Sequence, residues 1–259
     1  MKKIAFIGFG EVNTPKDILA EKSAGAVKVL ESIGEEGIAV YPVQDNPDRS
    51  SAEDALNQLQ GHTFDALVVC IAGWIPSYTV ISITSQFAHL PILLWGLTGY
   101  TRDGHLVTTA DQAGTSALRY VFEQLEYRFS YVYSTQDEGD PLEDISHFLA
   151  SAHALASLKR AKIGYVGYRD MHLYGTMFDG LRLKKTLGVE IECFELLELM
   201  QRGESVNDRD IDKIIDHIKS SWVIEGTLPI DMVRKGARLY AALRDKIYEE
   251  GYDAISLKD

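Results

Sequence analysis

Three chemically versatile side chains follow one predicted strand in the second half of the chain. Arg169, Asp170 and His172 stand within four positions, directly after the apolar run Ala161–Gly167. Because α/β proteins place ligand sites at the carboxyl ends of parallel strands, these side chains can face a ligand. Charged residues at this position can equally cap the next helix or pair across a subunit contact. The sequence leaves both interpretations open.

A tryptophan occupies a comparable position in the first half. Trp74 follows the predicted strand Ala66–Ala72, and Gly73 and Pro76 place it in a turn, so we expect it to be at least partly exposed. Its flat apolar ring can stack on a sugar, and its N–H can bond a hydroxyl. The alternative is a ring packed beneath a neighbouring loop. Trp95, at the end of another apolar run, is expected in the core.

A glycine-containing loop, Gly8-Phe9-Gly10, follows the first predicted strand and invites a dinucleotide-binding interpretation. The third glycine of that fingerprint is absent, and Asn13 stands in its place. The last glycine normally permits close packing of helix on strand, so a plain exit loop is the better interpretation. Thr14 or Asn13 would then cap the helix that begins near Pro15.

Other catalytic patterns do not assemble. The sequence has no G-x-S-x-G, H-E-x-x-H or Walker motif, and its seven histidines are scattered, as structural histidines usually are. Cys70 and Cys193 lie in apolar runs and are interpreted as core thiols. Acidic pairs such as Glu35-Glu36 are interpreted as solvated faces or caps. We therefore assign no catalytic residue and no metal ligand within this chain.

The composition is that of a folded protein of 259 residues with a formal net charge of −12. No basic cluster is present that could neutralise a run of phosphates, which argues against nucleic acid as a partner. The longest apolar run, Ala66–Ile75, is about half the ~20 residues of a membrane-spanning helix. Met1-Lys2-Lys3 leads straight into a strand without a cleavage site, so we expect a cytoplasmic protein and no membrane partner.

Apolar β-branched runs alternate with helical-period stretches, as in repeated βα units around a parallel sheet. The first half has predicted strands Lys3–Phe9, Ile38–Val43, Ala66–Ala72, Ile92–Trp95 and Tyr131–Ser134, and helices Asp17–Ile33, Ala52–Gln60, Val80–Ala88 and Gln112–Tyr127. A new series has predicted strands Ala161–Gly167, Glu190–Phe194 and Asp253–Leu257, and helices Thr176–Leu187, Asp208–Ser220 and Ile230–Glu250. Helix Glu143–Lys159 bridges the two series.

These elements predict an α/β protein with two doubly wound, Rossmann- or flavodoxin-like parallel-sheet domains. The N-terminal domain is expected to span residues 1–160 and the second domain residues 161–259. A parallel strand normally feeds a functional loop beyond its carboxyl end, whereas the chain stops two residues after the strand that ends at Leu257. We therefore expect the second domain to be incomplete at its C-terminal end.

Short motifs along the whole chain resemble those of the L-fucose isomerase and L-arabinose isomerase-like family. In chain order they are Gly73-Trp74 after the third strand, Leu90–Gly96, Lys162–Gly167, the turn Met171–Gly175 and the closing strand Gly251–Lys258. The resemblance implies the two N-terminal, Rossmann-like domains of a three-domain enzyme. It also implies a homo-oligomer that interconverts free aldoses and ketoses, such as 6-deoxyhexoses or pentoses, with a divalent metal, typically Mn²⁺.

The resemblance also implies roles for individual residues. Trp74 matches a family tryptophan that contacts the sugar bound in a neighbouring subunit, and Lys258 lies near a residue of the sugar site. With Arg169 and His172 they form the candidate substrate-binding set. The family's metal ligands come from positions after the strand that ends here, so we expect no Mn²⁺ bound by this chain alone. The family's basic residue early in the first loop has no clear equivalent.

Two other functions fit some of the same features. Two α/β lobes joined by a helix also describe non-enzymatic sugar-binding modules of the periplasmic-binding-protein type. A nucleotide-dependent oxidoreductase is the third possibility, weakened by the incomplete glycine loop.

Overall fold

The computed structural model of the chain describes residues 3–136, 138–224, 226–227 and 229–257. The chain forms two compact units, Met1–Ala156 (unit 1) and Ser157–Asp259 (unit 2). This division lies four residues before the boundary expected from the sequence. Both units alternate strands and helices around a parallel sheet, which confirms the predicted fold class.

Unit 1 is built on a five-stranded sheet whose strands run parallel. The strands are β1 (Ile4–Phe9), β2 (Gly37–Val43), β3 (Ala66–Ile71), β4 (Ile92–Gly96) and β7 (Phe129–Tyr133). Their order in the sheet is β2-β1-β3-β4-β7, which is the flavodoxin-like order 2-1-3-4-5. In this order the chain switches sides between β1 and β3, and the carboxyl edge at that point is where ligands bind.

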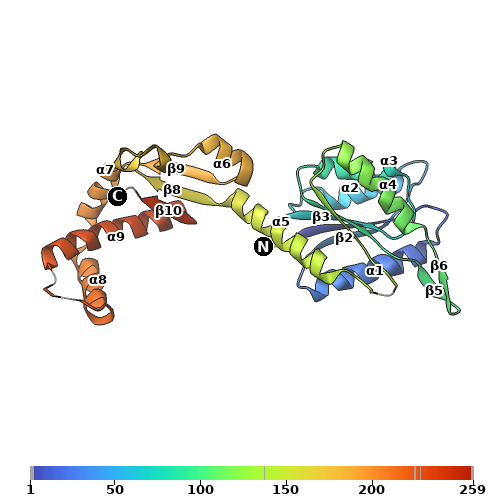
Figure 1. Ribbon diagram of the computed structural model, residues 1–259, viewed down its shortest axis with the longest axis horizontal. Coiled ribbons are helices and arrows are strands. Elements are labelled where there is room, and N and C mark those ends of the chain that lie inside the picture. The colour runs from blue at the N-terminus through green and yellow to red at the C-terminus, as the bar shows by residue number, and fades with distance from the viewer. Residues whose placement is uncertain (1–2, 137, 225, 228, 258–259) are drawn as a thin grey trace. The chain divides into compact units, whose positions relative to one another are not determined.

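Helices cover both faces of this sheet. They are α1 (Lys16–Ser32), α2 (Ser50–Leu59), α3 (Ser77–Thr84), α4 (Asp111–Gln124) and α5 (Leu142–Arg160). Ile7 and its same-face neighbours pack with apolar residues of α2, α3 and α4, whereas Phe6 packs on the opposite face with residues of α1 and α5. In Figure 1, α2, α3 and α4 accordingly lie above the sheet and α1 below it. Burial on both faces explains why these strands are continuous apolar runs.

The core contains the predicted tryptophan and one ionic cluster. Trp95 is fully buried, and its Nε1 donates to Ser134 Oγ over 2.9 Å. At the amino edge of the sheet, His153 of α5 contacts two carboxylates, with Nδ1 2.9 Å from Asp65 Oδ2 and Nε2 2.7 Å from Glu35 Oε2. All three side chains are at most 7% exposed. The interpretation of Glu35 as a solvated residue was therefore wrong, because this carboxylate turns inward to the imidazole.

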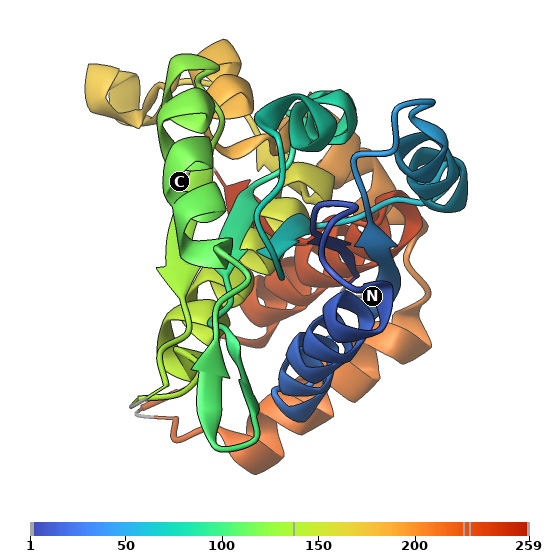
Figure 2. The same ribbon diagram turned by 90° about the vertical axis from the view of Figure 1, so that its right-hand side faces the viewer.

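A short hairpin that the sequence analysis did not assign projects from unit 1. Its strands are β5 (Tyr100–Arg102) and β6 (His105–Val107). The two residues between them, Asp103 and Gly104, have φ of 50° and 77°, the left-handed pair of a type I′ turn. Figure 2 shows the hairpin extending from unit 1 near α1.

Unit 2 has a three-stranded parallel sheet of β8 (Lys162–Val166), β9 (Glu190–Phe194) and β10 (Ala254–Leu257), in the order β10-β8-β9. When the three strands are numbered in chain order within unit 2 and counted from the β9 edge, their order is 2-1-3. The first three strands of unit 1 have the same order. Its helices are α6 (Gly180–Leu187), α7 (Leu196–Ser205), α8 (Asp208–Ser221) and α9 (Ile230–Glu250). Helix α7 was not predicted from the sequence, and α6 begins four residues later than predicted because Tyr174–Thr176 form a separate 3-10 turn.

The core of unit 2 is thinner than that of unit 1. Val166, Phe194 and Tyr252 form one small buried cluster, and α8 and α9 form a second. Helix α6 buries none of its residues, and Leu181 is 84% exposed. Cys193 on β9 is also exposed, so its interpretation as a core thiol was wrong, whereas Cys70 on β3 is buried. Unit 2 therefore leaves more of its apolar side chains exposed than unit 1 does.

In the described parts of the chain, no helix combines the length and the apolarity needed to cross a bilayer.

Candidate functional site

The loops after β1, β2 and β3 are joined by hydrogen bonds at the carboxyl edge of the unit 1 sheet. Gly10 N donates to Val43 O over 3.1 Å, Glu11 N donates to Trp74 O over 2.7 Å, and Val12 N donates to Asp45 Oδ1 over 2.8 Å. A dinucleotide-binding loop directs such N–H groups at a pyrophosphate. Because they are used inside the protein here, the geometry favours a plain exit loop over a nucleotide site.

Trp74 lies three residues beyond the end of β3 and is 39% exposed, as expected from its turn. Its backbone is fixed on both sides, because Trp74 N donates to Thr109 O over 2.8 Å and Trp74 O accepts from Glu11 N. A partly exposed indole on a fixed backbone is a ready surface for the apolar face of a sugar ring.

A buried ion pair supports the Trp74 loop. Lys22 Nζ of α1 lies 2.5 Å from Asp111 Oδ2, 2.7 Å from Thr109 Oγ1 and 2.6 Å from Ala72 O. The Lys22 and Asp111 side chains are 9% and 3% exposed. Burial lowers the pKa of Lys22 below its usual value, and the hydrogen bond and charge of Asp111 oppose that change. The ammonium thus links α1 and the start of α4 to Ala72, which lies two residues before Trp74.

Sequence reasoning missed Lys22, Thr109 and Asp111. One signal was available, because Lys22 lies three residues after Leu19 and four before Ala26, both of which belong to the buried stripe of α1. A cation on the inner face of a helix needs a buried partner. The partner itself could not be identified, because Asp111 is 89 residues away in the sequence.

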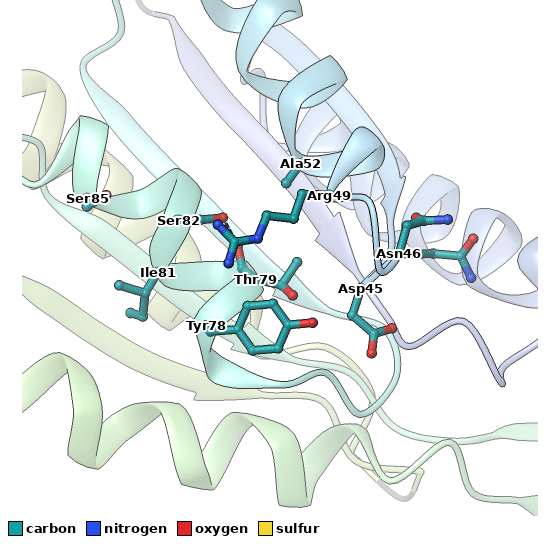
Figure 3. A pocket seen from close by; sticks show the side chains of 10 residues that line it. Asp45, Asn46, Arg49, Ala52, Tyr78, Thr79, Ile81, Ser82 and Ser85 are labelled. Carbon is teal, nitrogen blue, oxygen red and sulfur yellow. Dashed lines mark hydrogen bonds between the residues drawn. The ribbon is translucent and has the colours of Figure 1, made fainter.

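A pocket of about 280 Å³ opens beside this edge, between the β2–α2 loop and α3. Its lining includes Asp45, Asn46 and Arg49 from the loop, and Tyr78 and Thr79 from α3. Figure 3 shows the Arg49 side chain reaching toward α3, with Thr79 between Arg49 and Tyr78. The pocket was not predicted, because neither of the two segments that form it contains a recognisable binding motif.

In unit 2, the loop after β8 brings Arg169 and His172 together. The Arg169 guanidinium lies 3.9 Å from the centre of the Tyr174 ring and donates to the His172 backbone oxygen. Met171 and His172 have positive φ values of 42° and 60°, a conformation that costs non-glycine residues energy. Arg169 Nε and Asp170 Oδ1 are buried without a hydrogen-bond partner. Arg169 therefore folds onto its own loop, and the His172 residue stays exposed.

The other candidate residues are not gathered into this loop. Trp74 belongs to unit 1, and Lys258 lies outside the described residues. Among the residues that the structure describes, no group of three or more His, Cys, Asp or Glu side chains could hold a metal ion. The described residues therefore do not fit Mn²⁺.

No protein-family model matches this chain, and no curated protein matches it.

Proposed function

We propose that this chain is the N-terminal portion of a metal-dependent aldose–ketose isomerase that acts on a free sugar, such as a 6-deoxyhexose or a pentose. The observation that carries the proposal is Trp74, an indole 39% exposed at the carboxyl edge of a flavodoxin-like sheet and anchored there through its own N–H and C=O. Because the backbone of Trp74 is already fixed, little backbone entropy is lost when the sugar binds.

The strand order within each unit supports this proposal. The resemblance implies two consecutive Rossmann-like domains, and both units have parallel sheets that begin with the strand arrangement 2-1-3. In the proposed enzyme, Trp74 contacts the sugar bound in a neighbouring subunit, and Arg169, His172 and Lys258 remain candidate substrate-binding residues.

The open apolar surface of unit 2 supports the proposal that this chain belongs to a larger homo-oligomeric protein. Leu181 is 84% exposed and Met200 is 58% exposed. Exposed apolar side chains of this size can be covered by another domain or subunit. We propose that the rest of the enzyme, including the domain that supplies the Mn²⁺ ligands, covers part of this surface.

A sugar-binding module without catalytic activity is the second candidate. The pocket of Figure 3 favours it, because several of the side chains that line it can form hydrogen bonds with hydroxyl groups. The two candidates differ in one measurable respect, which is turnover by the longer gene product.

Chain 1–259 alone is expected to show no aldose–ketose isomerase activity, whereas the product of the complete reading frame shows it with Mn²⁺. The reason is chemical: acidifying a sugar C–H requires a metal held by several fixed ligands. Both proteins would be titrated with Mn²⁺ by calorimetry and assayed against pentoses and 6-deoxyhexoses. Turnover by chain 1–259 would place the catalytic groups within these residues. A complete product that binds sugar without turnover would support the sugar-binding module instead.

In the complete protein, Trp74→Ala is expected to lower kcat/KM by about tenfold, the loss of one stacking contact. Trp222→Ala is the matched control, because Trp222 is 65% exposed in unit 2, outside the sequence-predicted sugar site. Equal effects of the two substitutions would remove Trp74 from the site.

A further inference from the structure

We infer that the pocket between the β2–α2 loop and α3 is a second ligand site, which takes a small neutral polyhydroxylated molecule, a monosaccharide or a sugar alcohol. Trp74 is not among the residues that line this pocket. The inference rests on the pocket's own side chains and does not depend on the proposed isomerase function.

The first observation is a buried hydroxyl that lacks a partner. Thr79 is 3% exposed, it lines the pocket, and its Oγ1 makes no hydrogen bond. Buried hydroxyl groups in folded proteins nearly always have a partner, so an orphaned hydroxyl on a residue that lines a pocket is a candidate hydrogen-bonding group for a ligand. Its helix neighbour Ser82 donates instead to the Thr79 backbone oxygen over 2.7 Å, and so leaves the Thr79 hydroxyl unsatisfied.

The second observation is a cation at the pocket mouth. Arg49 is exposed, and no carboxylate of the described residues lies within ion-pair distance of its guanidinium. Figure 3 shows this side chain extended toward Ser82 and Thr79. A guanidinium carries several N–H donors in one plane, which can bond two adjacent oxygens of a ligand.

The side chains of Asp45, Asn46 and Tyr78 add further hydrogen-bonding groups to the pocket. The Asp45 carboxylate accepts from Val12 N through Oδ1, and this bond fixes its orientation at the wall. Asn46 adds an amide that can both donate and accept. Tyr78, which is 54% exposed, adds an aromatic face and a hydroxyl. The pocket thus presents donors and acceptors around one flat apolar surface.

Charge and size select the ligand class. A lining with one arginine and one aspartate has no net charge, which favours a neutral ligand over an anion. A hydroxyl group donates and accepts, so a polyol can satisfy Arg49, Asp45 and Thr79 together. The volume of about 280 Å³ lies at the low end for small-molecule pockets, which fits a single ring.

The test is a titration of chain 1–259 followed by methyl NMR and calorimetry. The neutral probes are L-fucose, D-ribose and ribitol, and the anionic probes are inorganic phosphate and D-gluconate. At least one neutral probe is expected to shift the Thr79 and Ile81 methyl signals saturably, and the anions are expected not to. The same shifts should persist in Trp74→Ala, which separates this pocket from the proposed isomerase site.

Two variants test the contacts. Arg49→Gln is expected to weaken the neutral probe by about tenfold, and Thr79→Val by about fivefold. Thr84→Val is the matched control, because Thr84 Oγ1 is also buried and unpartnered on α3 but does not line the pocket. The inference is overturned if no neutral probe binds saturably, if only the anions shift these methyl signals, or if Thr84→Val weakens binding as much as Thr79→Val.

Discussion

Replacing His153 with alanine is expected to destabilise unit 1 by about 3–5 kcal/mol, the cost of breaking a buried ionic cluster by removing one member. The imidazole contacts Asp65 through Nδ1 and Glu35 through Nε2. Alanine would leave both carboxylates at the amino edge of the sheet without the imidazole that contacts them.

The measurement is urea unfolding of chains that also carry Trp74→Phe and Trp222→Phe, so that the tryptophan fluorescence comes from Trp95 in the core of unit 1. His147→Ala is the matched control, because His147 lies on the same helix and is exposed. The control should change the free energy of unfolding by less than about 0.5 kcal/mol, the usual range for a surface substitution. Similar effects of the two substitutions would show that the cluster contributes nothing beyond helix α5 itself.

Asp111→Ala is expected to destabilise unit 1 by about 3 kcal/mol, because it leaves the Lys22 ammonium buried without its carboxylate. Glu21→Ala, an exposed carboxylate next to Lys22 on α1, is the control and should have little effect. The double variant Lys22→Met with Asp111→Ala should lose less than the sum of the single variants, since no charge is left unpaired. Strict additivity would mean that the two side chains do not interact.

The stability of Asp111→Ala should also depend on pH in a defined direction. Burial already lowers the pKa of Lys22, and Asp111 is the group that opposes this change. Without Asp111 the folded-state pKa falls further, so the unfolded chain binds more protons than the folded one at alkaline pH. Stability therefore rises as the pH increases from the lowered pKa toward about 10.4, the ordinary lysine value. A fall in stability over this range would contradict the assignment.

Apolar patterns in the sequence correctly predicted the elements whose buried residues recur at regular spacing. Strand β3 was found within one residue because all its side chains are buried, and α9 was found at both ends because its apolar stripe is long. Helix α7 was missed because it is short and contains Gly203, a poor helix former. A Cβ at that position would lie 3.7 Å from the Arg238 backbone oxygen on α9, an ordinary van der Waals contact, so the packing of α7 on α9 does not require this glycine. The hairpin turn Asp103-Gly104 carried a usable signal that had not been applied.

The candidate sites were predictable only where one segment sufficed. Trp74 was placed correctly because Gly73 and Pro76 define its turn locally. The Lys22–Asp111 pair and the pocket of Thr79 and Arg49 join segments far apart in the chain, so no periodicity reveals them. Cys193 shows the converse error: an apolar run indicates a strand, but only the packing of β9 decides which of its alternating side chains faces solvent.

The unequal burial of the two cysteines makes each unit separately observable by thiol chemistry. Thiolates are the reactive form, and burial in β3 raises the pKa of the Cys70 thiol well above its usual range. A maleimide should therefore modify the exposed Cys193 at once and reach Cys70 only when the core of unit 1 opens. The rate of the second modification then measures the opening free energy of unit 1 in the intact chain, without denaturant.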